Sequence, residues 1–320
     1  MKYYLLFDNN RNDKDFVVSK LGLPIIVIYS PETKKKIFGW IRGVLEVVSK
    51  SKQKDTIICW YDFQAIICWW VCLLMFKKRN IVCINLLLKD KRTLKNKIVS
   101  YLYRRALQSV NFKASVTSKS YGEWLNKKLG INAKYSLVND VYHDFYKFEK
   151  EVVQIPNSVF CGGNNGRDWN LIIKIARSLP NIRFNMVMPH NIYIKYQSMF
   201  TKNINVKYNI SYDEFMKELC GSSVVCLPLD TQAPAGLIVM FQAAANLKPI
   251  ITTRTVTTIE YVTPERGVVL PNELEIWVKA ILNSLANIRV SEDKAINFRN
   301  YLKENCSEIT FINKIKEMLF

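Results

Sequence analysis

The sequence has few residues of the kinds that build metal sites, fibres or membrane spans. It contains only 2 His, 11 Gly and 10 Pro in 320 residues, and no cysteine pair has the CxxC spacing of a zinc site. This composition argues against a zinc-ribbon fold and against a low-complexity or fibrous chain. The most hydrophobic segment, residues 65–76, is far shorter than the roughly 20 residues that a membrane-spanning helix needs. We therefore interpret it as a buried helix, with a membrane-dipping helix as the alternative. The first residues turn polar quickly, and we expect no secretory signal.

The remaining composition is that of a globular chain. Hydrophobic residues make up 49% and aromatic residues 12% of the sequence, which is enough for two domains that each bury a core. The cysteines lie mostly inside apolar runs, and we expect them to be reduced core residues of a cytosolic protein: Cys59, Cys68, Cys72, Cys83, Cys161, Cys220, Cys226 and Cys306.

Acidic residues are scarce in the first half. Residues 1–150 hold 28 Lys and Arg against 12 Asp and Glu, whereas residues 151–320 hold 18 against 15. The excess is densest over residues 77–105, where Asp90 is the only acid among ten basic residues. Such a positive field attracts phosphate on nucleic acid, anionic lipid or a lipid-linked diphosphate; a solvated face is the alternative.

The order of the elements predicts two doubly wound α/β domains. In the first domain, strands are expected at residues 3–7, 25–29, 56–61, 81–86, 114–117 and 134–138, and helices at 35–49, 65–77, 94–108 and 121–129. The charged segment 139–156 is interpreted as a linker. Strands at 158–161, 183–188, 223–228 and 249–252 then alternate with helices at 169–178, 212–220 and 237–246. Such alternation is typical of parallel sheets covered on both faces, and we place the domains at 1–145 and 146–320.

A glycine-rich turn opens the second domain. Gly162 and Gly163 end a strand, and Arg167 lies at the start of the next helix, where its charge and free backbone N–H groups can bind one diphosphate. The fingerprint GxGxxG is absent, because Gly166 completes only GGxxG, and this disfavours a nicotinamide enzyme. The alternative is a surface arginine paired with Asp168.

A second turn of small residues begins at Ala233 and leads into a helix. The N–H groups of Gly236 and Leu237, after Ala235, are open to a ligand phosphate because no bulky side chain precedes them. Gln242 follows on the same helix and is placed to bond a ribose hydroxyl.

These motifs resemble the C-terminal domain of GT-B glycosyltransferases of the family 4 type, in particular bacterial enzymes of O-antigen, capsule or exopolysaccharide synthesis. The likeness runs from about residue 158 to residue 271 and is looser in the first half. It is carried by GG-x-x-x-RDW, SYDEF, LPLDTQAPAGL, FQAAANLKPII and IEYVTPERGVVLP. It implies a GT-B fold of two Rossmann-like domains facing across a cleft, with the acceptor bound by the first domain and the nucleotide sugar by the second. It also implies retaining transfer without a metal.

Single positions follow or depart from the family pattern. Arg167 matches the basic residue that neutralises the donor diphosphate and stabilises the leaving phosphate. Gly163 stands where the family often has a second basic residue, and Pro234 and Gln242 replace the usual pair of glutamates that have seven residues between them. Neither His143, in the linker, nor His190, after a strand of the second domain, matches the family histidine near the sugar, and both are interpreted as structural or surface residues.

The resemblance therefore predicts a hexosyltransferase-type enzyme that uses a nucleotide sugar, UDP-sugar favoured, and no cofactor. Its expected acceptor is a polyprenyl-diphosphate-linked glycan at the inner face of the plasma membrane, with basic residues meeting the anionic membrane and acceptor: Lys91, Arg92, Lys95, Lys97, Arg104 and Arg105. A catalytically silent sugar-nucleotide-binding relative and a sugar-nucleotide epimerase of the same architecture stay open. A nucleic-acid-binding protein is disfavoured, because no aromatic-basic strand signature or recognition helix is present.

Overall fold

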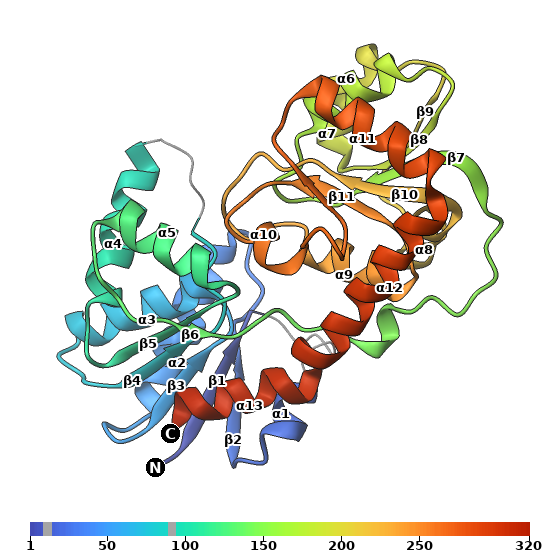
Figure 1. The fold of residues 1–320 in the computed structure, drawn as a ribbon. Coiled ribbons are helices and arrows are strands. Elements are labelled where there is room, and N and C mark those ends of the chain that lie inside the picture. Colours follow the sequence, from blue (N-terminus) through green and yellow to red (C-terminus); the bar gives the residue numbers. More distant parts are fainter. Residues whose placement is uncertain (9–14, 89–93) are drawn as a thin grey trace. The chain divides into compact units, whose positions relative to one another are not determined.

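The chain divides into two α/β units (Figure 1). The computed structural model describes residues 1–8, 15–88 and 94–320, without the side chains at 15, 94 and 95. Unit 1 comprises residues 1–141 and 308–320, and unit 2 comprises residues 142–307. This corrects the expected domains 1–145 and 146–320, because the C-terminal thirteen residues return to the first unit.

Unit 1 contains a six-stranded parallel sheet in the order β2-β1-β3-β4-β5-β6. The strands are rich in Ile, Val and Leu, as expected of strands buried on both faces. They are β1 (Tyr3–Phe7), β2 (Ile25–Tyr29), β3 (Thr56–Cys59), β4 (Asn80–Cys83), β5 (Phe112–Val116) and β6 (Ser136–Leu137).

Helices cover both faces of this sheet. Tyr3, Leu5 and Phe7 alternate along β1 onto one face, where they pack with α1 (Asp15–Leu21) and α13 (Glu308–Leu319). The buried side of α13 presents Phe311 and Ile315 to this cluster, which is the physical reason that the chain ends in unit 1. The other helices of the unit follow right-handed crossovers onto the opposite face: α2 (Lys36–Lys50), α3 (Asp62–Leu74), α4 (Leu94–Leu107) and α5 (Lys119–Leu129).

Unit 2 contains a second six-stranded parallel sheet, in the order β12-β11-β10-β7-β8-β9. Its strands are β7 (Ile155–Gly162), β8 (Arg183–Val187), β9 (Ile204–Lys207), β10 (Ser222–Leu227), β11 (Ile250–Thr253) and β12 (Val268–Leu270). The helices are α6 (Trp169–Ser178), α7 (His190–Tyr196), α8 (Tyr212–Gly221), α9 (Leu237–Ala245), α10 (Thr258–Tyr261), α11 (Leu274–Ala286) and α12 (Ile288–Asn305), with short 3-10 turns at Asp144–Tyr146 and Gln197–Met199.

Successive residues of β7 enter two cores on opposite faces of the second sheet. Val159 and Cys161 pack with α6 and α11, whereas Phe160 packs with α8, α9 and α12. The predicted doubly wound architecture is therefore confirmed, with two parallel sheets flanked by helices.

The hydrophobic segment 65–76 forms most of helix α3 and the two residues that follow it. Ala65, Ile66 and Cys68 are buried, whereas Leu74 and Phe76 are 73% and 98% exposed. Within the described ranges, no helix has the length and apolar character to cross a membrane. All eight cysteines are buried, and within the described residues none of them forms a disulfide, as expected from their apolar surroundings.

Candidate functional site

Two loops meet at the carboxyl ends of the neighbouring strands β7 and β10. The Asp168 N–H donates to the carbonyl oxygen of Pro228 over 2.9 Å, and the Asp230 N–H donates to the carbonyl oxygen of Gly166 over 3.0 Å. The glycine-rich turn and the small-residue turn predicted from the sequence are thus joined by backbone hydrogen bonds. In open α/β sheets, the carboxyl edge is where ligands bind.

Arg167 lies between these loops and is only 6% exposed. Its Nε donates to the carbonyl oxygen of Gly162 over 2.8 Å, and one Nη donates to the carbonyl oxygen of Asn165 over 2.9 Å. Burial lowers the pKa of Arg167, and the nearby Cys161 and Asp230 oppose this shift. An arginine stays charged nonetheless. Asp168 does not pair with it, since the Asp168 carboxylate instead accepts from the N–H of Leu171 as the cap of α6.

Two glycines lie directly against the Arg167 guanidinium. Gly163 has φ +119°, and a Cβ built there would lie 2.6 Å from Nη2 of Arg167. Gly236 has φ +80°, and a Cβ there would lie 3.2 Å from Nη1. Both backbone conformations favour glycine, and both side chains would crowd the cation. The two glycines, far apart in sequence, therefore flank one buried positive charge.

Gly236 is the N-cap residue of helix α9 and provides no side-chain hydrogen bond to it. Ala235 precedes it in the partly exposed turn, while the side chain of Leu237 is 4% exposed and packs into the core. Leu237 can therefore offer a ligand only its backbone. The first N–H groups of a helix have no partner within the helix and carry partial positive charge. This N-terminus and Arg167 are placed to attract the same anion.

Gln242 lies farther along α9, about 8 Å from its start at 1.5 Å per residue. The side chain is 5% exposed, and its Oε1 has no hydrogen-bond partner in the part of the chain that the structure describes. Burial raises the pKa of Tyr212, and a hydrogen bond with Gln242 opposes that rise. A buried amide oxygen without a hydrogen-bond partner lowers the stability of the fold. This position therefore fits a ligand hydroxyl group that donates a hydrogen bond to Oε1.

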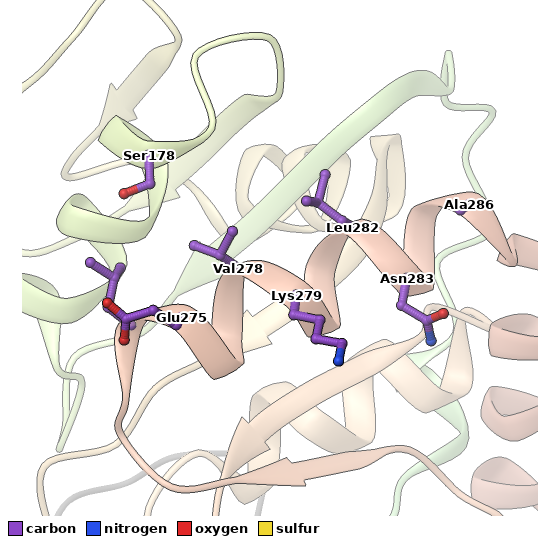
Figure 2. A pocket seen from close by; sticks show the side chains of 8 residues that line it. Ser178, Glu275, Val278, Lys279, Leu282, Asn283 and Ala286 are labelled. Atoms are coloured by element: carbon purple, nitrogen blue, oxygen red, sulfur yellow. The ribbon is translucent and has the colours of Figure 1, made fainter.

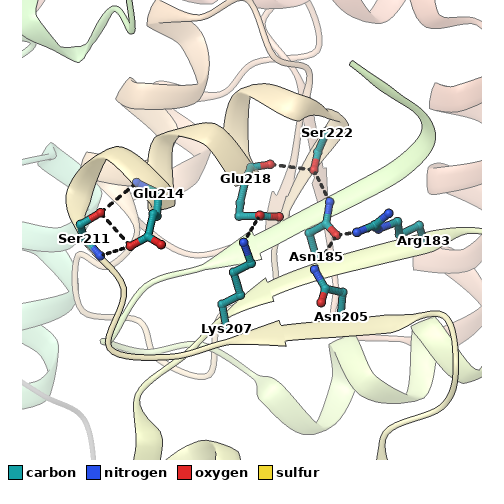
Figure 3. Close-up of polar contacts among 8 residues, drawn as sticks. All are labelled: Arg183, Asn185, Asn205, Lys207, Ser211, Glu214, Glu218 and Ser222. Carbon is teal, nitrogen blue, oxygen red and sulfur yellow. Dashed lines mark hydrogen bonds and ion pairs between the residues drawn. The ribbon is translucent and has the colours of Figure 1, made fainter. Parts of the chain in front are cut away.

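Tyr212 is the first residue of α8, and polar contacts hold that helix in place (Figure 3). Ser211 and Glu214 form a reciprocal capping box, and Lys207 of β9 pairs with Glu218 over 2.7 Å. At the far end of α8, the Ser222 hydroxyl donates to the carbonyl oxygen of Glu218 over 2.9 Å. These contacts fix α8, and the hydrogen bond between Tyr212 and Gln242 joins its first turn to α9.

A further set of polar residues supports the site and was missed by the sequence interpretation. Asn272 donates to the carbonyl oxygen of Leu229 over 2.8 Å and to the Asp168 carboxylate over 3.4 Å. The Thr253 hydroxyl donates to Asn272 over 2.6 Å and accepts from the Leu229 N–H over 2.8 Å. Gln232 accepts from the N–H of Val256 over 3.0 Å. These contacts join three loops, and their long sequence separations leave no local signal.

The predicted basic residues of unit 1 lie on a different unit from this site. Lys97, Arg104 and Arg105 are exposed on α4. Lys91 and Arg92, together with the side chain of Lys95, lie outside the described residues, so the structure does not place them.

Neither histidine lies next to Arg167 in the structure. His143 is buried and stacks on Phe145 with ring centroids 4.7 Å apart. His190 is exposed, and its ring lies 4.7 Å from that of Tyr208 beyond the ends of β8 and β9.

A groove of about 640 Å³ lies elsewhere in unit 2, along α11 and the last residue of α6 (Figure 2). Figure 2 shows Val278 and Leu282 beside Glu275 and Lys279 on α11. Ser178, at the groove, ends the helix that Asp168 caps, about 15 Å away along a ten-residue helix. The groove is therefore separate from the Arg167 site.

Comparison with known proteins identifies the architecture. No family model and no curated protein match the sequence. The solved structure of HepE from Anabaena in complex with UDP is similar over 100% of this chain and 99% of its own, with TM-score 0.72 and 13% identity. Sucrose-phosphate synthase from Thermosynechococcus elongatus is similar over 100% and 98%, with TM-score 0.79 and 10% identity. A glycosyltransferase from Rickettsia africae is similar over 99% and 97%, with TM-score 0.69 and 12% identity. The chain has the GT-B-like two-domain α/β fold of these structures.

Proposed function

We propose that this protein is a retaining hexosyltransferase that moves a sugar from a nucleotide diphosphate donor to a lipid-linked glycan. The observation that carries the proposal is the buried Arg167, which has no carboxylate within hydrogen-bonding distance among the described residues and lies beside the N-terminus of α9. A buried charge is costly unless it is paired. The donor diphosphate is the anion that completes the pair, and HepE, which has a similar fold, was solved with UDP and with UDP-glucose. UDP is therefore the favoured nucleotide.

Arg167 acts on the leaving group in this proposal. As the bond between the sugar and the phosphate breaks, negative charge grows on the diphosphate, and the guanidinium and the α9 N–H groups stabilise it. Preorganised donors of this kind commonly supply the largest single part of catalysis. The phosphate can then accept the proton of the attacking hydroxyl, so neither histidine is needed. The same fixed positive charge supports transfer without a metal.

Gln242 holds the ribose in this arrangement. Its unpaired Oε1 accepts a hydrogen bond from a ribose hydroxyl, while the diphosphate occupies the helix start about 8 Å away. Pro234, in the place of the family glutamate, has no side-chain group to bond the sugar. A catalytically silent donor-binding relative is therefore the second candidate, and it differs from the first in lacking turnover.

The acceptor is proposed to be a polyprenyl-diphosphate-linked glycan of bacterial surface polysaccharide synthesis, bound by unit 1 at the inner face of the plasma membrane. The exposed Lys97, Arg104 and Arg105 on α4 and the excess of basic residues in the first half support a phosphate-bearing partner.

Thermal-shift measurements with UDP, GDP, CMP and dTDP sugars test the donor. We expect a UDP-sugar to raise the melting temperature most, since a ligand that binds only the folded state stabilises it. Release of UDP upon addition of lipid-linked glycans would establish transfer, whereas donor binding without release would favour the silent relative. No shift with any nucleotide diphosphate would contradict the proposal.

A further inference from the structure

Three neighbouring loops form the amino edge of the first sheet, at the opposite end of the strands from the carboxyl edge. They are residues 51–55, 75–79 and 108–111, which lead into β3, β4 and β5. These strands are adjacent in the sheet. We call the three segments the amino-edge loops.

Hydrogen bonds hold the amino-edge loops side by side. Arg79 donates through Nη2 to the carbonyl oxygen of Ser51 over 2.7 Å and through Nε to its hydroxyl over 3.0 Å. The Ile81 N–H donates to the carbonyl oxygen of Asn111 over 2.9 Å. The loops are therefore one connected surface.

This surface exposes apolar side chains that are not packed into the core. Phe76 is 98% exposed, Val110 is 95% exposed, and Leu74, which ends α3, is 73% exposed. Phe76 also has φ +53°, a left-handed conformation that costs a residue with a side chain about 1–2 kcal/mol. A glycine is usual at such a helix end, so neither packing nor backbone geometry explains a phenylalanine here.

The charge around these apolar residues is positive. The amino-edge loops contain Lys52, Lys54, Lys77, Lys78 and Arg79, and their one acid is Asp55. Asp55 is 5% exposed, and its carboxylate accepts from the N–H groups of Lys2 and Lys52, each over 2.8 Å. The accessible charge of the loops is therefore basic.

We infer that the amino-edge loops dock on an anionic lipid bilayer, with Phe76 and Val110 entering the interface and Lys52, Lys54 and Lys78 meeting the headgroups. Exposed apolar residues combined with basic residues are what a membrane-surface contact requires. The inference rests on the proposed function in one respect only: docking would keep the enzyme near a lipid-linked acceptor. Docking at this edge leaves the carboxyl edges of the sheet strands open.

Phe76→Gly separates the role of the side chain from folding. Glycine suits φ +53°, so the variant should be at least as stable as wild type in urea. Its partitioning onto vesicles of phosphatidylglycerol and phosphatidylcholine should fall about tenfold, because a large apolar side chain no longer enters the interface. Its UDP affinity should equal that of wild type, which keeps this test independent of the donor site. If the Phe76→Gly variant binds these vesicles as tightly as wild type, the inference is overturned.

Charge variants then locate the contact. Reversal of Lys52 and Lys78 to Glu should weaken partitioning at least fivefold per residue, since each basic residue contributes about 1 kcal/mol at such a surface. Lys174→Glu with Arg177→Glu, on α6 of unit 2, makes the same charge change and should have little effect. Wild-type binding should be lost on pure phosphatidylcholine and when salt rises from about 0.1 M to about 1 M, because the Debye length falls from about 10 Å to about 3 Å.

Two other outcomes would also overturn the inference. Loss of binding in Lys97→Glu with Arg104→Glu, but not in the loop variants, would assign the membrane contact to α4. In the second outcome, wild type does not bind anionic vesicles but self-associates, and Phe76→Gly abolishes the self-association. The amino-edge loops would then be an interface between copies of the chain.

Discussion

Replacement of Gly236 by alanine should separate backbone strain from donor binding. Gly236 has φ +80°, and the added Cβ would lie 3.2 Å from Nη1 of Arg167. The left-handed backbone alone should lower the free energy of unfolding by about 1–2 kcal/mol. The same methyl group stands where the diphosphate is expected to approach Arg167 and the N-terminus of α9. Losing one charged hydrogen bond there costs about 1.5–3 kcal/mol, which weakens UDP binding by roughly 10- to 150-fold.

Gly130→Ala is the matched control for this variant. Gly130 has φ +62° at the end of α5 in unit 1, and a Cβ built there would meet no atom within 4 Å. Urea unfolding should show a similar loss of stability in both variants, whereas calorimetric titration should show weakened UDP binding only in Gly236→Ala. Wild-type affinity in Gly236→Ala would refute the placement of the diphosphate at this turn.

Two further variants test other parts of the account. Gln242→Met removes a buried unpaired acceptor together with the hydrogen bond to Tyr212, two effects of opposite sign, so the free energy of unfolding should change by no more than about 1 kcal/mol. UDP affinity should fall several-fold while affinity for inorganic diphosphate does not change; equal losses for both ligands would show that Gln242 does not touch the ribose. Burial alone would raise the pKa of Asp55, but hydrogen bonds from the backbone of Lys52 and Lys2 bring it below its usual value. A lowered folded-state pKa stabilises the fold above the unfolded value of about 3.9 and loses that effect as pH falls. Asp55→Asn should therefore lower the free energy of unfolding in urea more at pH 7 than at pH 3, and a pH-independent difference would contradict this.

The elements that local sequence dictates were predicted well. Helix α6 was expected at residues 169–178 and has those bounds, because Asp168 caps it and its apolar residues recur at helical spacing. Strands β1 and β2 also match their predicted ranges, since each is a short apolar run between polar segments, although only β1 is buried along its whole length. The two turns around Arg167 could be identified from their glycines and small residues.

Features that depend on the tertiary structure could not be predicted. Helix α13 has an apolar face that any complementary surface could cover, and only the fold shows that unit 1 covers it. The burial of Arg167 depends on a loop more than sixty residues later, and Asn272 and Thr253 support that loop from farther still. Phe76 belonged to an apolar run that predicts a buried helix, and the structure shows its side chain to be exposed.

Calorimetric titration of UDP into wild type and Arg167→Ala tests the central claim most directly. Urea unfolding should first establish that the variant remains folded, because Arg167 also bonds the carbonyl oxygens of Gly162 and Asn165. The account predicts that the dissociation constant for UDP rises roughly 10- to 150-fold, the effect of losing about 1.5–3 kcal/mol of charged hydrogen bonding. A folded Arg167→Ala variant that binds UDP as tightly as wild type would contradict the account.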